Sequence, residues 1–146
     1  MRYNEAMIAL NHVLTGTAIG LALRQPLLAA PLALASHFVL DMVPHFVYGK
    51  PWGRLFLTSF ILDALSTAAA LAWLVLSAPQ LTVLLLLCGI CAELPDVLWL
   101  YVNRWPTHWY FVFHKKIQRS ETLWGIVPEL CYLALIIAVN AALLPR

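Results

Sequence analysis

Apolar and polar positions divide the chain into long apolar stretches separated by short polar breaks. Proline lies in or beside most of these breaks, and proline ends helices because it cannot continue the backbone hydrogen bonding. A helix needs about 20 mostly apolar residues to cross the hydrocarbon core of a bilayer. The stretches that approach this requirement are residues 6–23, 27–47, 55–77, 81–102 and 122–144. The pattern predicts an all-α integral membrane bundle of about five transmembrane helices, forming a single domain over residues 1–146.

The connection over residues 103–121 differs from the other breaks because it is long and mixes aromatic with basic side chains. Tryptophan, tyrosine and cationic side chains settle at the boundary between lipid and water. We therefore expect an interfacial amphipathic segment before the last helix.

Composition supports the membrane interpretation. The chain is 62% hydrophobic and 11% charged, with a mean hydropathy of +0.82, whereas soluble domains carry about 25% charged residues. The net charge is only +2 and no basic stripe is present, so nucleic acid is not expected as a partner. The spacing of Cys88 and Cys91 is that of a CxxC motif, but no second pair accompanies it, and we interpret both as small buried hydrophobic residues.

The distribution of cations predicts an orientation. With five crossings, one side of the membrane receives Arg2, Lys50, Arg54, Arg104, Lys115, Lys116 and Arg119. The other side receives only Arg24 and Arg146. Because cytoplasmic loops are enriched in Lys and Arg, we expect a multi-pass protein of the inner (plasma) membrane with a cytoplasmic N-terminus and an external C-terminus.

Three ionisable residues recur at intervals of four in the second stretch: His37, Asp41 and His45. On a helix this spacing places them along one stripe. Ionisable groups within a membrane helix are costly unless they pair, line a wet cavity or bind a metal. This stripe is therefore the first candidate site.

Other apolar stretches carry ionisable residues at a similar depth from the cytoplasmic side. These residues are His12, Asp63, Glu93, Asp96 and Glu129. No lysine or arginine lies within the five apolar cores, and the only polar groups expected in their outer halves are those of Thr and Ser. The inward-facing groups must therefore satisfy one another, share a metal ion, or form a path for protons or ions. Imidazole with carboxylate suits Zn²⁺ or another first-row divalent ion.

Two prolines lie close to these groups. Pro95 lies between Glu93 and Asp96, and Pro44 precedes His45. Proline within a membrane helix bends it and is tolerated where the helix lines a cavity. The segment 105–120 would lie over this cavity as a lid.

The motifs resemble those of a known family. An early Asn11-His12 is followed by Ser36-His37-x3-Asp41-x2-Pro44-His45, by Leu94-Pro95-Asp96 and by His114. This arrangement is similar to that of small bacterial membrane-bound metal-dependent hydrolases, the inner-membrane hydrolase family that includes LexA-binding members. The resemblance covers most of the chain and implies metal-dependent hydrolysis.

These observations favour a zinc-dependent hydrolase that acts on a lipid or lipid-linked substrate near the cytoplasmic interface. The expected metal ligands are His12, His37, Asp41 and Asp96, with His114 as a fifth ligand or an acid–base group. The expected general base is Glu93 or Asp63. The residues expected to draw in a charged head group are Lys115, Lys116, Arg119 and His45. The alternatives are a proton- or cation-conducting protein and a non-catalytic scaffold whose polar cluster sets helix register.

Overall fold

A computed structural model describes residues 8–46, 53–99, 104–105, 107–118 and 122–145. Within these residues the fold is helical, and the only β-type pairing is an isolated bridge between Phe46 and Thr122. The α-helices are α1 (Ala9–Leu23), α2 (Pro26–Leu40), α3 (Arg54–Ser77), α4 (Thr82–Trp99), α5 (Trp109–Ile117) and α6 (Ile126–Leu143). Two short 3-10 turns, η1 (Pro79–Leu81) and η2 (Leu123–Gly125), precede α4 and α6. The predicted all-α class is confirmed.

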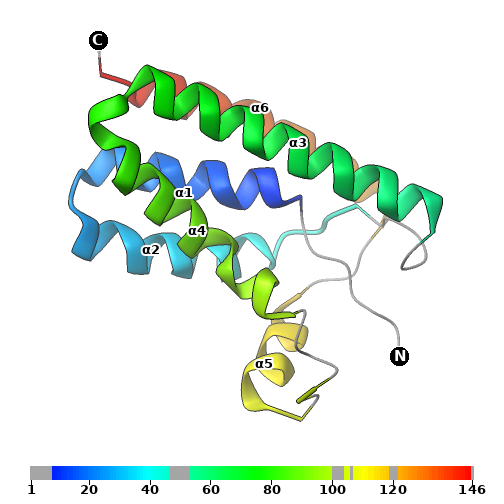
Figure 1. The fold of residues 1–146 in the computed structure, drawn as a ribbon. Coiled ribbons are helices and arrows are strands. Elements are labelled where there is room, and N and C mark those ends of the chain that lie inside the picture. The colour runs from blue at the N-terminus through cyan, green and yellow to red at the C-terminus, as the bar shows by residue number, and fades with distance from the viewer. Residues whose placement is uncertain (1–7, 47–52, 100–103, 106, 119–121, 146) are drawn as a thin grey trace.

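Helix α1 is the centre of the bundle (Figure 1). It packs against α2, α3, α4 and α6, and most of its side chains are buried, polar as well as apolar ones. The main apolar core forms around Leu14, Leu21, Leu74 and Leu85. Helix α5 stands outside this bundle, next to the C-terminal end of α4. The central helix therefore brings the surrounding helices to a common set of buried polar residues.

Helices α1 and α4 approach each other closely because glycine lies at their contact. A Cβ atom added to Gly16 would clash with the carbonyl oxygen of Cys88 and would lie 2.8 Å from the Cβ of Ala92. One turn later, Gly20 faces the side chain of Cys88. Small residues at helix contacts in membranes allow this kind of backbone approach. The contact places α1 beside the first two thirds of α4, from Leu84 to Ala92.

Three helices are long and apolar enough to cross a membrane: Arg54–Ser77, Pro79–Leu98 and Ile126–Leu143. Helix α3 buries only Leu74, and it leaves Phe60 63% and Leu76 80% exposed. Helices α1 and α2 are apolar but have 15 residues each, which is about 22 Å at 1.5 Å per residue. The number of crossings and the orientation of the termini stay predictions.

The predicted second helix is too long. Helix α2 ends at Leu40, and Asp41 is its C-cap, whereas the sequence pattern extended it to residue 47. Pro44 explains the early end, because proline disfavours helical backbone in the residue before it. Pro95, in contrast, lies inside α4 as predicted. The last helix also begins later than predicted, after Thr122 has paired with Phe46.

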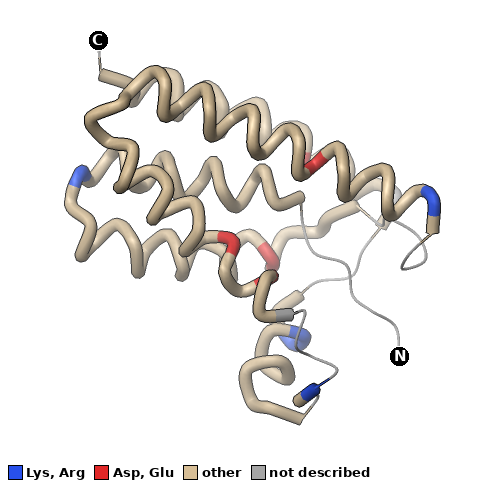
Figure 2. Tube along the Cα trace, in the orientation of Figure 1, with Lys and Arg blue, Asp and Glu red and all other residues tan. Residues whose placement is uncertain are grey.

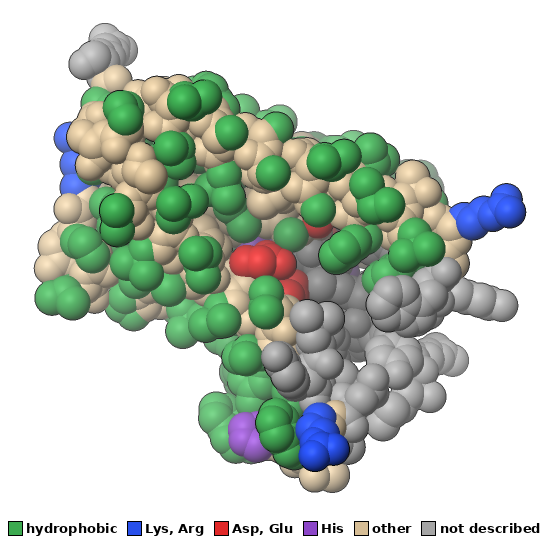
Figure 3. Space-filling view, viewed as in Figure 1, with side chains coloured by type: hydrophobic (Ala, Val, Ile, Leu, Met, Phe, Trp, Pro, Cys, Tyr) green, Lys and Arg blue, Asp and Glu red, His purple; other side chains and the backbone are tan. Residues whose placement is uncertain are grey.

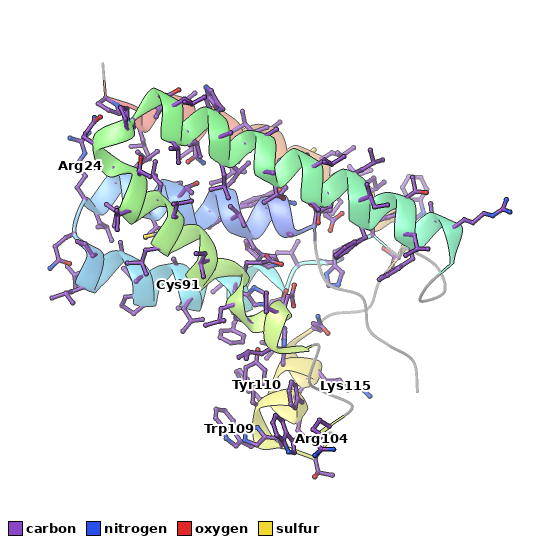
Figure 4. All side chains as sticks on the ribbon, viewed as in Figure 1. Arg24, Cys91, Arg104, Trp109, Tyr110 and Lys115 are labelled. Atoms are coloured by element: carbon purple, nitrogen blue, oxygen red, sulfur yellow. The ribbon has the colours of Figure 1, made fainter. Side chains whose placement is uncertain are left out.

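Charged residues are unevenly placed along the bundle (Figure 2). Arg24 lies at the turn between α1 and α2, at the end away from α5 (Figure 4). Arg104 and Lys115 belong to the part of the chain around α5. Acidic residues lie between these extremes. The bundle thus has one end with ionisable groups beside α5 and one end with few.

Candidate metal centre

Four side chains from three helices, three of them buried and Asp96 half-buried, converge on one point. His37 and Asp41 come from the end of α2, Asp96 from α4 and His114 from α5. Each offers one ligand atom, and these atoms all lie within 4.8 Å of one another. We refer to these residues as the His–Asp cluster. The cluster brings together three of the four predicted ligands, His37, Asp41 and Asp96. Its fourth member, His114, is the histidine that we expected to fold back from the segment 105–120.

The distances within the His–Asp cluster are short. Oδ2 of Asp41 lies 2.6 Å from Nε2 of His114 and 3.2 Å from Nε2 of His37. Oδ1 of Asp96 lies 3.5 Å and 3.8 Å from the same two nitrogens. The two Nε2 atoms are 3.4 Å apart. Nitrogen and oxygen ligand atoms therefore face one small volume.

Local backbone structure positions the α2 pair. Asp41 keeps a helical conformation, and its N–H donates to the carbonyl of His37, so the two side chains stay one turn apart on the same face. Nδ1 of His37 lies 2.8 Å from the carbonyl oxygen of Ala92. A carbonyl only accepts, so this nitrogen carries the proton and Nε2 is left to act as a ligand, as in histidines that bind metals.

His12 on α1 is the fifth side chain at this place. Its ring stacks on that of His37 with 4.1 Å between centroids. Its Nε2 lies 3.5 Å from Oδ1 of Asp41, and the ring is fully buried. His12 therefore lies beside the His–Asp cluster, on the Asp41 oxygen that the other histidines do not use.

Several buried polar atoms here make no hydrogen bond within the described structure. They are Nδ1 and Nε2 of His12, Oδ1 of Asp41, and both carboxylate oxygens of Asp96. A buried polar group without a partner costs about 1–3 kcal/mol, and more if it is charged. No lysine or arginine among the described residues forms an ion pair with either acid. The donor set and these atoms fit a divalent cation, and the cluster could hold one.

Helix α5 is held to the bundle by its inward side. The hydroxyl of Tyr110 donates to the carbonyl oxygen of Pro95 at 2.8 Å. Phe38 on α2 packs edge-on against Phe113 and His114. Burial, with the negative charges of Asp96 and Asp41, raises the pKa of Tyr110 above its ordinary value, so the hydroxyl remains a donor. Tyr110 was not among the predicted site residues, although it lies four residues before His114, a spacing that places both side chains on one face of a helix.

Glu93 and Asp63, the two candidate bases, occupy different surroundings. Glu93 is half-buried on α4, one turn before Asp96, and its Oε2 has no hydrogen bond among the described residues. Asp63 on α3 instead accepts from the backbone N–H groups of Ala9 at 2.8 Å and Leu10 at 3.1 Å. Those donors belong to the first turn of α1 and have no partner within the helix.

Glu129 joins Asp63 at the same place. This α6 residue is fully buried, and its Oε1 lies 3.5 Å from the backbone nitrogen of Ile8, the N-cap of α1. We call the two acids, with the first turn of α1, the α1 cap. These carboxylates satisfy backbone donors at a buried helix end.

The residues expected to bind substrate fall into three situations. Lys115 and Lys116 are exposed on α5. His45 lies beyond the end of α2, not on a helical stripe; it is fully buried, with Nδ1 3.0 Å from the carbonyl oxygen of Val43. Arg119 lies outside the described residues. Acidic side chains are visible in a hollow below α3 (Figure 3).

The half of the bundle that was expected to lie on the outer side is more polar than expected. Asn140 on α6 is fully buried, which corrects the expectation that only Thr and Ser provide polar groups there. Its amide donates to the carbonyls of Leu14 and Ile136 and accepts from the hydroxyl of Thr17. These groups satisfy one another, so they lock α1 to α6.

Comparisons of this chain with protein-family models, with curated proteins and with solved structures gave no match.

Proposed function

We propose that the protein is an integral membrane hydrolase that uses a divalent metal, most simply Zn²⁺, on a lipid or lipid-linked substrate. The observation that carries the proposal is the His–Asp cluster, whose ligand atoms lie within 4.8 Å of one another. The buried atoms of His12, Asp41 and Asp96 that make no hydrogen bond within the described structure also support the proposal. Imidazole and carboxylate form the donor set of catalytic zinc sites, and the bond from Nδ1 of His37 to Ala92 directs its Nε2 toward the other ligand atoms.

His37, Asp41, Asp96 and His114 would hold the metal, with His12 beside Asp41. A bound divalent ion supplies Lewis-acid activation of water or of a substrate oxygen. Glu93 would accept the proton of the attacking water, since its oxygen is half-buried, without a hydrogen bond and one turn from Asp96. Asp63 is the weaker candidate, because both of its oxygens accept backbone N–H groups at the α1 cap.

The surroundings of the cluster support a lipid substrate. The bundle exposes large apolar side chains along α3, and α5 carries exposed Lys115 and Lys116 next to the cluster. Cations at a membrane surface attract phosphate and carboxylate head groups. We extend this to five crossings in the inner membrane, with the cluster in the cytoplasmic half, the N-terminus inside and the C-terminus outside.

The two alternatives have less support. A proton or cation path needs polar groups through the whole bundle, and Asn140 and Thr17 bond to each other and to backbone carbonyls. A purely structural cluster would have most of its polar atoms bonded to protein groups, as Asp63 does with both of its oxygens, whereas the His–Asp cluster and His12 together leave several without a hydrogen bond.

The decisive experiment is elemental analysis of protein purified without chelators, followed by assays on phospholipids and lipid-linked phosphates. We expect about one metal ion per chain, and Glu93→Gln should keep that metal while losing about 10²–10⁴ in rate. Glu129→Gln is the matched control, because this glutamate lies at the α1 cap and should leave the rate unchanged.

Other outcomes are equally informative. Folded, stable protein without bound metal would reject the proposal. Loss of metal in Glu93→Gln would make Glu93 a ligand and move the base elsewhere. Full activity in that variant would show that Glu93 is not the base.

A further inference from the structure

Helix α5 has two faces with different chemistry. The inner face consists of Tyr110, Phe111 and His114, which are buried or half-buried against the bundle. The outer face consists of Trp109, Val112, Phe113 and Lys116. Trp109 is 71% exposed, Val112 56% and Phe113 45%. Trp109 and Val112 thus form an apolar stripe that the bundle leaves exposed, and Phe113, whose ring also contacts Phe38 of α2, lies at its border.

Cations border this stripe. Lys115 and Lys116 are exposed in the last turn of α5, and Arg104 and Trp105 are exposed just before the helix. Figure 4 shows Trp109 directed away from the bundle, while Tyr110 points towards the end of α4. Exposed tryptophan and phenylalanine beside lysine is the composition of helices that lie in an anionic membrane surface.

The inner face connects directly to the His–Asp cluster. Tyr110 bonds to the carbonyl of Pro95, the residue before Asp96, and His114 contacts Asp41 at 2.6 Å. His114 is the only residue of the cluster that comes from outside the bundle. An interaction that holds α5 against the bundle therefore also holds one proposed metal ligand, His114, in place.

We propose that anionic phospholipid head groups bind the outer face of α5 and that this contact strengthens metal binding at the His–Asp cluster. The proposal rests on the proposed metal site. Lysines near a surface contribute about 1 kcal/mol each to binding anionic lipid, and the apolar stripe enters the interface below them. Lipid then favours the seated position of α5, which is the position in which His114 completes the cluster. The outer face is a lipid sensor, and the inner face transmits its state to the metal.

The test measures Zn²⁺ affinity by competition with a chromophoric chelator for the full chain in nanodiscs. One set contains phosphatidylcholine alone and the other includes phosphatidylserine. We expect affinity roughly 5- to 30-fold higher with phosphatidylserine, corresponding to one or two lysines at about 1 kcal/mol each. Empty nanodiscs of both compositions correct for zinc that binds to lipid.

Matched variants separate seating of α5 from simple attraction of zinc to a charged surface. The double substitution Lys115→Gln with Lys116→Gln should keep the affinity in phosphatidylcholine and lose the increase. Arg24→Gln, at the opposite end of the molecule, should keep the increase. His114→Ala should bind zinc more weakly and show no lipid dependence, because the link between α5 and the metal is removed.

Equal zinc affinity in both lipids would overturn this inference and leave the proposed function standing. An increase that persists in the lysine variant would also overturn it, since surface attraction alone would then explain the effect. Absence of zinc binding in either lipid would overturn both this inference and the proposed function. An acidic protein as the true partner of α5 would appear as equal affinity in the two lipids.

Discussion

Two groups of acids in this bundle, each with one fully buried and one half-buried member, illustrate opposite ways of removing charge from water. At the α1 cap, Asp63 and Glu129 face the backbone N–H groups of the first turn of α1. In the His–Asp cluster, Asp41 and Asp96 face histidines and leave oxygens without hydrogen bonds within the described structure. Both groups draw on several helices.

The difference lies in what each group faces. A helix N-terminus has N–H donors without partners and a partial positive charge, so carboxylates there complete the protein's own hydrogen bonding. Imidazoles whose second nitrogen is bound elsewhere, such as His37 with Ala92, offer lone pairs as the carboxylates do. Lone pairs that face one another need a proton or a cation between them, and one divalent cation satisfies several of them at once. Burial of an acid alone therefore does not identify a metal site; the convergence of several imidazole and carboxylate atoms on one point does.

The largest difference that we expect between substitutions in the two groups of acids and histidines is in metal binding. His37→Ala should lower zinc affinity by more than about 100-fold, because even outer-shell changes at metal sites cost 10- to 100-fold. Asp63→Asn should change it little. Titration of both variants with zinc in detergent micelles gives the measurement. Equal losses in the two variants would mean that the α1 cap and the cluster form one site.

The second effect is on stability. Asp63→Ala removes the acceptor for the N–H groups of Ala9 and Leu10. At about 1–3 kcal/mol for each fully buried group the loss would be about 2–6 kcal/mol, and we expect the lower half of this range because both hydrogen bonds are only partly buried. Metal stoichiometry should stay the same. Thermal unfolding with parallel metal analysis would show this, with Ser66→Ala on the exposed side of α3 as control. Unchanged stability together with lost metal would assign Asp63 to the metal site.

The smallest effect concerns the satisfied pair in the outer half. Asn140→Leu removes the bonds to Thr17, Leu14 and Ile136. Hydrogen bonds between membrane helices average about 0.6 kcal/mol, with a maximum near 1.7, so we expect a modest decrease in stability and unchanged metal content. A change in the proton permeability of proteoliposomes, measured with a pH-sensitive dye, would instead support the alternative that the protein conducts protons or cations.

Much of the helical order follows from local pattern. The apolar stretches become α1, α2, α3, α4 and α6, and the aromatic and basic segment contains α5. His37 and Asp41 could be paired from their spacing alone, because a helical turn brings residues four apart together. His114 could be anticipated as a contributor, since the segment that carries it follows α4.

Other features depend on packing that no local pattern contains. The role of Asp63 depends on the packing of α1 against α3. This packing brings the first turn of α1 to an acid that is 54 residues away in the sequence. Pro44 predicts that α2 ends before it, whereas the apolar residues that follow Pro44 predict that the helix continues. His45 illustrates the consequence: once the helix stops at Leu40, its side chain leaves the stripe and becomes buried beside η2, where Gly125 has no room for a Cβ.

The α1 cap also has a consequence for how the protein is made. Its acids are separated in sequence from the N–H groups they meet by 54 residues for Asp63 and by 121 for Glu129. At a synthesis rate of about 5–20 residues per second, roughly 6–24 s pass between translation of the first helix and arrival of Glu129. During that interval the start of α1 lacks at least one of the two acids that complete it. We expect the first helix to depend on a temporary partner, such as lipid head groups or the insertion machinery, until the last helix replaces it.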